Sequence, residues 1–148
     1  MITIRNELFK DCYEELKPLF KKNWEEVEQY TGLEFSVDYN RYAALELADI
    51  LHITIARNHG KIIGYMLDFI QYHMHYLNDK FAINDVFYVI PDFRGTKIPL
   101  KILKHKQDEL RKQNVVFHII SMVEGHCYEK LAITAGYHII ETNWAIKL

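Results

Sequence analysis

The 148-residue sequence predicts an α/β (α+β) fold, in which a mixed, mostly antiparallel sheet carries helices on both faces. The spacing of apolar residues changes near residue 50 from a period of about 3.6 to a period of 2, so helices precede a run of strands. Further along, a helical segment joins two apolar strands, 81–90 and 115–122, which predicts a β-α-β crossover. The length suits one domain over residues 1–148.

The first part of the chain is expected to form one strand and two helices. Residues 2–5 alternate in polarity as a strand does, and residues 11–30 place apolar side chains at helical spacing. Pro18 either kinks this helix or moves its start to near Lys17, because proline is tolerated in a first turn. Residues 40–49 have the pattern of a short second helix.

A hairpin and a further strand follow. Residues 51–58 and 62–72 alternate in polarity on either side of a His-Gly-Lys turn, which is a hairpin signal. A polar loop at 73–80 leads into strand 81–90. Together these segments predict a meander of three strands.

The C-terminal part continues the alternation of helix and strand. A helix is expected over 99–113, a buried strand over 115–122 and a last helix over 124–135. Gly136 ends that helix, since glycine is the usual helix stop, and residues 137–147 have strand character.

Composition argues against several classes of protein. The formal net charge is −2, whereas general nucleic-acid or membrane-surface binders carry a clear basic excess. No run approaches the roughly 20 apolar residues of a membrane span, and the N-terminal stretch lacks a signal-peptide core. Cys12 and Cys127 match no metal-ligand spacing and no disulfide framework. We therefore expect a cytoplasmic protein with reduced thiols and no metal.

The strongest functional signal is VIPDFRGTKIPLKIL, residues 89–103, in which a strand runs through a polar turn into a helix. A helix start binds phosphate well, because its N–H groups and dipole favour anions. This turn has little glycine, so Lys97 must be reached with ordinary dihedral angles, and Pro99 offers no N–H. Lys97, Lys101 and Lys104 would share one helix face and could supply positive charge instead.

The pattern V-x-P-x-x-R-G followed by I-x-x-x-x-L resembles the cofactor-binding segment of the GNAT superfamily of N-acetyltransferases, and the resemblance covers nearly the whole chain. GKIIGY is similar to that family's second-to-third-strand hairpin, NDVFYVIPDFRG to its fourth strand and turn, and LAITAGYHIIETNWAIKL to its last helix and C-terminal strands. The resemblance implies transfer of an acetyl group from acetyl-CoA to a primary amine by direct attack in a ternary complex.

The resemblance also implies where coenzyme A would bind. In the family, a bulged fourth strand splays from the fifth, and its backbone holds the pantetheine arm and polarises the thioester carbonyl. By position this role falls on Phe87, Tyr88 and Val89. The phosphates would lie on the turn and the following helix, at Arg94, Gly95, Thr96, Lys97, Ile98, Pro99 and Lys101.

Two residues are candidates for proton transfer. The family often has a tyrosine four residues before the glycine that here is Gly136, but that position is Ala132. Tyr128, one turn earlier, could protonate the leaving thiolate, or else water or the substrate does so, or catalysis is weak. Asp85 could act as the base, directly or through water. The competing interpretations are an ordinary half-buried tyrosine and an exposed strand carboxylate.

Other constellations carry weaker signals. His73 and His75 would share a strand face, but spacing suggests no third metal ligand. His126 and Cys127 are helix neighbours, whose side chains diverge by roughly 100° and do not form a nucleophile pair. On the acceptor side, the aromatic residues suggest a pocket that is not strongly anionic. They are Tyr30, Phe35, Tyr39, Tyr42, Tyr72 and Tyr76.

Two rival functions remain open. The departures at Lys97, Pro99 and Ala132 would suit a catalytically degenerate binding or structural module. A basic helix face would suit a nucleic-acid-binding domain, although the acidic total opposes this. That face would comprise Lys97, Lys101, Lys104, Lys106, Arg111 and Lys112. The resemblance also implies a homodimer paired through C-terminal strands.

Overall fold

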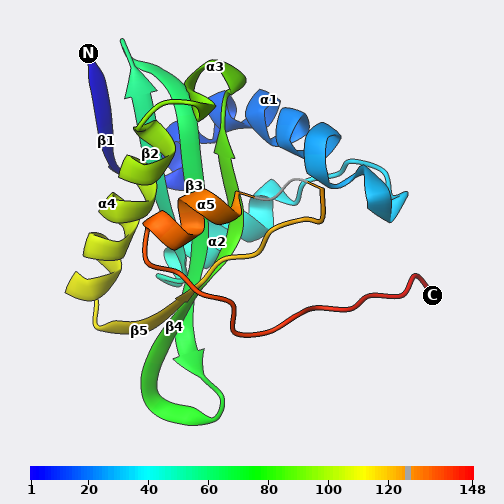
Figure 1. The fold of residues 1–148 in the computed structure, drawn as a ribbon, viewed down its shortest axis with the longest axis vertical. Coiled ribbons are helices and arrows are strands. Elements are labelled where there is room, and N and C mark those ends of the chain that lie inside the picture. The colour runs from blue at the N-terminus through cyan, green and yellow to red at the C-terminus, as the bar shows by residue number, and fades with distance from the viewer. Residues whose placement is uncertain (126–127) are drawn as a thin grey trace.

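The structure, a computed structural model that describes residues 1–125 and 128–148, is built on a five-stranded sheet in the order β1-β2-β3-β4-β5 (Figure 1). Strands β1 to β4 pair antiparallel, and β4 pairs parallel with β5. The predicted meander, mixed sheet and β-α-β connection are therefore confirmed. The strands are β1 (Ile2–Glu7), β2 (Leu51–Asn58), β3 (Lys61–His73), β4 (Tyr76–Val89) and β5 (Val115–Ile119).

Helices cover both faces of the sheet, as predicted. In Figure 1, α4 and α5 lie in front of the sheet, and α1 and α2 lie behind it. The short α3 connects the end of β4 to α4. The helices are α1 (Phe9–Val27), the 3₁₀ helix η1 (Gln29–Thr31), α2 (Tyr39–Leu47), α3 (Pro91–Arg94), α4 (Ile98–Lys112) and α5 (Glu129–Thr134).

Each face of the sheet has its own apolar core. On one face, Leu16 and Phe20 of α1 pack against strand residues that include Tyr65. On the other face, Ile102 and Leu103 of α4 pack against the opposite side of the same strands. Each fully buried side chain of this kind stabilises the fold by about 1.5–3 kcal/mol. The two cores hold the middle strands rigid between the two helix layers.

Helix α1 passes through Pro18 without ending, so the suggested start near Lys17 is wrong. The helix begins at Phe9, and Pro18 lies on its exposed side. The carbonyl that loses its N–H partner at a proline can bind water on such a face.

Several predicted segment boundaries differ from the structure. Strand β4 begins at Tyr76, because the segment predicted as a polar loop continues the β3–β4 hairpin to a His73–Tyr76 pair. Strand β5 ends at Ile119, short of residue 122. Helix α5 begins only at Glu129, and residues 126–127 of the predicted last helix lie outside the described residues.

The predicted strand over 137–147 is absent from the described structure, where these residues are extended coil without ladder pairing. A segment of alternating polarity forms a strand only where it pairs with a sheet edge. Residues 137–147 pair with no edge of the described sheet. Among the described residues, no helix is both long and apolar enough to cross a membrane.

Candidate functional site

The centre of the site is a bulge in β4 at Asp85. In the ladder, Leu67 of β3 pairs with Val86, and the next β3 residue, Asp68, pairs with Asn84. Asp85 is therefore an extra residue without a partner on β3. Because a bulge turns two consecutive side chains toward one side of a sheet, Asp85 and Val86 both line the same cavity. The bulge lies just before Phe87, where the stretch that the resemblance assigned to the cofactor begins.

Beyond the bulge, β4 and β5 separate. Their pairing runs to Ile83 and Ile119, and within the described residues no pair follows. Strand β4 nevertheless continues to Val89, paired on its other side with Gly64, Tyr65 and Met66 of β3. The backbone of residues 87–89 thus has a strand partner on one side only. A ligand with its own donors and acceptors can pair with such an edge.

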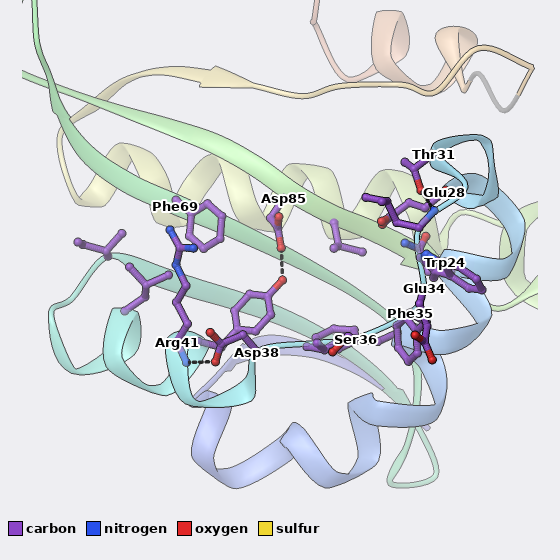
Figure 2. Close-up of a pocket in the computed structure, with 18 of the residues that line it drawn as sticks. Trp24, Glu28, Thr31, Glu34, Phe35, Ser36, Asp38, Arg41, Phe69 and Asp85 are labelled. Carbon is purple, nitrogen blue, oxygen red and sulfur yellow. Dashed lines mark hydrogen bonds between the residues drawn. The ribbon is translucent and has the colours of Figure 1, made fainter. Parts of the chain in front are cut away.

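A cavity of about 600 Å³ opens beside the bulge, between the end of α1, the 33–38 segment, α2 and the strands (Figure 2). This volume suits a small-molecule ligand. Its walls combine aromatic rings with four carboxyl groups and one guanidinium. The carboxyl groups belong to Glu28, Glu34, Asp38 and Asp85, and the guanidinium to Arg41. The expectation of a pocket that is not strongly anionic is therefore wrong.

Asp85 is the carboxyl group best placed for chemistry. Its side chain opens into the cavity, and the Tyr42 hydroxyl donates a hydrogen bond to it. Burial raises the pKa of Asp85 above its usual range, the hydrogen bond from Tyr42 opposes this, and the negative charge of Asp68 adds to it. Burial and the neighbouring Asp85 likewise raise the pKa of Glu28. A raised pKa makes a carboxylate a stronger proton acceptor.

Only some of the predicted acceptor aromatics line the cavity. Phe35 and Tyr42 do so, while Tyr39 stacks on Phe20 of α1 at a centroid distance of 6.4 Å. Three others, Tyr30, Tyr72 and Tyr76, are exposed elsewhere. Sequence reasoning missed three aromatic wall residues, Phe20, Trp24 and Phe69. Phe20 and Trp24 fall in segment 11–30, whose apolar spacing predicted a helix and no site.

The turn after β4 uses ordinary dihedral angles, as predicted. Lys97 has φ −75° and Gly95 has φ −78°, so neither needs the left-handed region. The Thr96 hydroxyl donates to the Phe93 carbonyl at 2.7 Å and accepts from the Ile98 N–H at 3.2 Å. The Ile98 N–H is therefore engaged within the turn.

Arg94 ties this turn to α1. Its Nε donates to the Val89 carbonyl at 2.7 Å, and its NH2 group lies 2.8 Å from both carboxylate oxygens of Glu26. Its guanidinium also lies over the Tyr88 ring. The side chain that the resemblance assigned to phosphate thus already holds β4 and α1 together.

The predicted basic face is only partly available. Lys97 and Lys101 are exposed at the start of α4, whereas Lys104 donates to the Ala135 carbonyl at 3.1 Å. Lys106 is buried, so it cannot contact nucleic acid. Arg111 and Lys112 each pair with an acidic residue three positions away. These placements contradict a continuous basic stripe on α4.

Tyr128 lies beside the strand end on the α5 side. It directly precedes α5, and its ring packs edge-to-face on Phe87 at 5.4 Å. Its hydroxyl donates to the Ser121 carbonyl at 3.2 Å. Ala132, where the family often has tyrosine, is buried in α5. The structure thus brings Tyr128 next to the predicted cofactor strand.

The remaining candidates contribute no site. His73 and His75 lie at the hairpin turn with ring centroids 5.3 Å apart, and the described part of the chain contains no group of three His, Cys, Asp or Glu that could hold a metal ion. His126 and Cys127 lie outside the described residues. Burial raises the pKa of the Cys12 thiol to about 12, so this cysteine is no nucleophile.

Three solved structures illustrate what the chain is similar to. A ribosomal-protein-alanine N-acetyltransferase from Brucella melitensis biovar Abortus is 15% identical with a TM-score of 0.74, over 100% of this chain and 99% of that one. A Clostridium acetobutylicum protein classed as an acetyltransferase, solved with acetyl-CoA, is 17% identical with a TM-score of 0.74, over 99% and 96%. A soil-metagenome aminoglycoside acetyltransferase in complex with sisomicin is 14% identical with a TM-score of 0.76, over 99% and 97%.

No protein-family model matches the sequence, and no curated protein matches it significantly. At identities this low, structural similarity shows the fold alone. The chain therefore has the fold of the GNAT N-acetyltransferases along its whole length, and the fold that the sequence resemblance implied is confirmed.

Proposed function

We propose that residues 1–148 form one acetyl-CoA-dependent N-acetyltransferase domain that transfers the acetyl group to a primary amine by direct attack in a ternary complex. The observation that carries this proposal is the β4 bulge. It joins an acidic cavity on one face to a strand end that pairs on one side only. Similar solved structures that are acetyltransferases, one with acetyl-CoA, support it.

The cofactor would lie along the end of β4 and over the turn. The backbone of Phe87, Tyr88 and Val89 would hold the pantetheine arm and polarise the thioester carbonyl. The phosphates would meet residues 94–99 at the start of α4, with Lys97 and Lys101 as point charges. These charges compensate for the missing N–H of Pro99 and the engaged N–H of Ile98.

The acceptor would be a cationic amine in the acidic cavity. The four carboxyl groups attract a protonated amine, and aromatic walls suit a cation with apolar parts. Attack requires the neutral amine, so a proton must leave. Asp85, with its raised pKa and its hydrogen bond from Tyr42, is placed to accept it.

The transfer step balances with these groups. The amine nitrogen forms a bond to the thioester carbonyl carbon, the carbon–sulfur bond breaks, and coenzyme A leaves as a thiolate. Before attack the ammonium loses one proton to Asp85, which releases it to solvent, and after attack the nitrogen loses a second proton to Asp85, directly or through water. Tyr128, packed on Phe87, donates a proton to the thiolate and regains one from solvent.

The test is a thiol-release assay with acetyl-CoA and three groups of amines: polycations, peptide N-termini and phosphorylated amines. The polycations are expected to react best, because the cavity carries excess negative charge. Asp85→Asn should lower kcat by about 10²–10⁴-fold while acetyl-CoA binding is kept. Asp79→Asn, on the exposed hairpin end of β4, is the matched control. Tight acetyl-CoA binding without thiol release from any amine would contradict the proposal.

A degenerate binding module is the second candidate, and the turn favours it. The N–H of Ile98 is engaged by Thr96, and Pro99 has none. Calorimetric titration of acetyl-CoA into the wild type and Lys97→Ala separates the two candidates. Micromolar binding that weakens in the variant supports the enzyme, whereas no binding at millimolar acetyl-CoA supports the module.

We also propose a homodimer, built on the C-terminal segment. Five large apolar side chains between residues 139 and 148 are exposed, and Trp144 is 94% exposed. Large apolar side chains exposed along one segment suit an interface that would cover them. Light scattering of the wild type and of a Trp144→Ser variant would test it, and a monomeric wild type at all concentrations would rule it out.

A further inference from the structure

Below the bulge lies a buried charged cluster that the sequence did not reveal. Asp68 of β3 is fully buried, and the Lys106 ammonium of α4, itself 1% exposed, lies 3.0 Å from one of its oxygens. His118 Nε2 of β5 lies 2.8 Å from the other oxygen. Burial alone would raise the pKa of Asp68, but Lys106 and His118 hold it below its usual range. Asp68 is therefore a carboxylate inside the protein.

Stability does not explain such a cluster. Taking two charges out of water costs about as much as their attraction returns, and apolar side chains of similar volume often serve as well. A buried ion pair is better explained by what it positions. The cluster joins β3, α4 and β5 at the level of the bulge, so the bulge is what it can position.

Asn84 connects the cluster to the bulge. Its side-chain amide donates to the main-chain carbonyls of Leu67 at 2.9 Å and Val86 at 3.0 Å, which flank the bulge on the two strands. The same nitrogen lies 3.3 Å from Asp68. Because carbonyl and carboxylate oxygens only accept hydrogen bonds, all three contacts require the NH₂ end of Asn84 here, and Asp68 shares its two hydrogens with the two carbonyls. The amide thus bridges the gap that the extra residue opens in the ladder.

We propose that Asp68 and Asn84 are positioning residues that set the β4 bulge, and with it the reacting geometry of the proposed acetyl transfer. This inference rests on the proposed function. The bulge aims Asp85 into the acceptor cavity and begins the stretch whose backbone would hold the thioester. Neither positioning residue touches a reacting atom. Lys106 and His118 keep Asp68 ionised and in place.

The primary test compares Asn84→Leu with Asn6→Leu. The control makes the same substitution on β1, at the other end of the sheet order. There the Asn6 amide donates a hydrogen bond to Glu109 and accepts one from Thr54, so it is likewise engaged in side-chain hydrogen bonds. Asn84→Leu should lower kcat about 100-fold, because a small displacement of reacting groups has that effect. Calorimetry should show a smaller effect on acetyl-CoA affinity than on kcat, about tenfold or less, since the α4 turn that would hold the phosphates is unchanged. Asn6→Leu should keep kcat.

A second readout needs neither turnover nor ligand. Hydrogen exchange of the Val86 amide, which pairs with Leu67 of β3, should be at least about tenfold faster in Asn84→Leu than in wild type or Asn6→Leu when followed by NMR. Faster exchange with an inactive wild type would refute the proposed function but keep the bulge assignment. Unchanged exchange, or kcat within about twofold of the control, would overturn the positioning role.

If Asn84→Leu does not fold, the double variant Asp68→Leu/Lys106→Met replaces it. This variant exchanges the ion pair for apolar side chains, which keeps the interior packed. The positioning role predicts a folded protein with kcat reduced at least about tenfold. A folded double variant with wild-type kcat would show that the cluster only holds the layers together.

Discussion

Removing the charge of Lys106 while leaving its partner is expected to destabilise the fold strongly. In Lys106→Met, the Asp68 carboxylate stays buried with 0% exposure and loses the ammonium 3.0 Å away. Nothing on α4 replaces it, because the neighbouring positions Ile102, Leu103 and Leu110 are apolar. The His52 carbonyl also loses the donor that now lies 3.2 Å from it.

The magnitude follows from the Asp68 charge, which keeps its contacts to His118 and Asn84 but loses the Lys106 cation. Breaking a buried pair by removing one partner costs about 3–5 kcal/mol, a large share of a total stability of about 5–15 kcal/mol. The double variant Asp68→Leu/Lys106→Met should regain most of that loss, because no unpaired charge remains. A residual cost of about 1 kcal/mol is expected, since the His118 ring loses its acceptor.

Urea denaturation followed by circular dichroism measures both changes. With a slope of about 1–3 kcal/mol/M, Lys106→Met should lower the midpoint by about 2 M, and the double variant by much less. The slope itself should stay constant, so that the midpoint reports stability. The reasoning is refuted if the single variant loses less than about 1 kcal/mol, or if the double variant is the less stable of the two.

Three further predictions address stability and reactivity. Hydrogen bonds from Arg57 lower the pKa of Glu7 from its ordinary 4.5, so its stabilising effect is complete above that pH and is lost as the pH falls through the folded value. The stability gap between wild type and Glu7→Gln, measured by thermal melting, should therefore close in acid. In Gly64→Ala, the new Cβ would lie 3.2 Å from the Tyr88 carbonyl oxygen, and melting should reveal a loss of about 1–3 kcal/mol. Cys12, buried and with its pKa raised to about 12, should resist iodoacetamide in the folded protein and react in urea, as peptide mapping would record.

Periodicity was sufficient for the strands and helices that bury a regular apolar face. The hairpin of β2 and β3 and the helix α4 have boundaries within a residue or so of those predicted, because apolar spacing reflects burial directly. It was insufficient at residues 137–147, whose alternation has no pairing edge in the structure. Hairpin ends are equally difficult, since Tyr76 and Lys80 fall in the segment predicted as a polar loop yet pair with β3.

The parts of the site that the backbone forms could be predicted from the sequence, and the parts that packed side chains form could be predicted less well. The bulge and the turn followed from a resemblance in one strand-turn-helix segment. The acidic character of the cavity did not follow from that segment, because its four carboxyl groups come from separate elements. The buried cluster did leave a signal: Asp68 interrupts an apolar strand, and Lys106 falls on the apolar face of α4. A buried charge at either position predicts an oppositely charged or hydrogen-bonding partner nearby.

Helix α1 contributes to both halves of the site. Near its C-terminal end, Glu26 holds Arg94 and so the turn that would carry the phosphates, while Trp24 forms a wall of the acceptor cavity. A ligand bound at the turn or in the cavity orders this helix end. It therefore lowers the entropic cost of ordering the same helix end when the second ligand binds at the other place. Each substrate should then raise the affinity of the other by the same factor, because such coupling is reciprocal. Glu26→Gln should reduce this coupling between the two substrates by a larger factor than it reduces the affinity for either substrate measured alone.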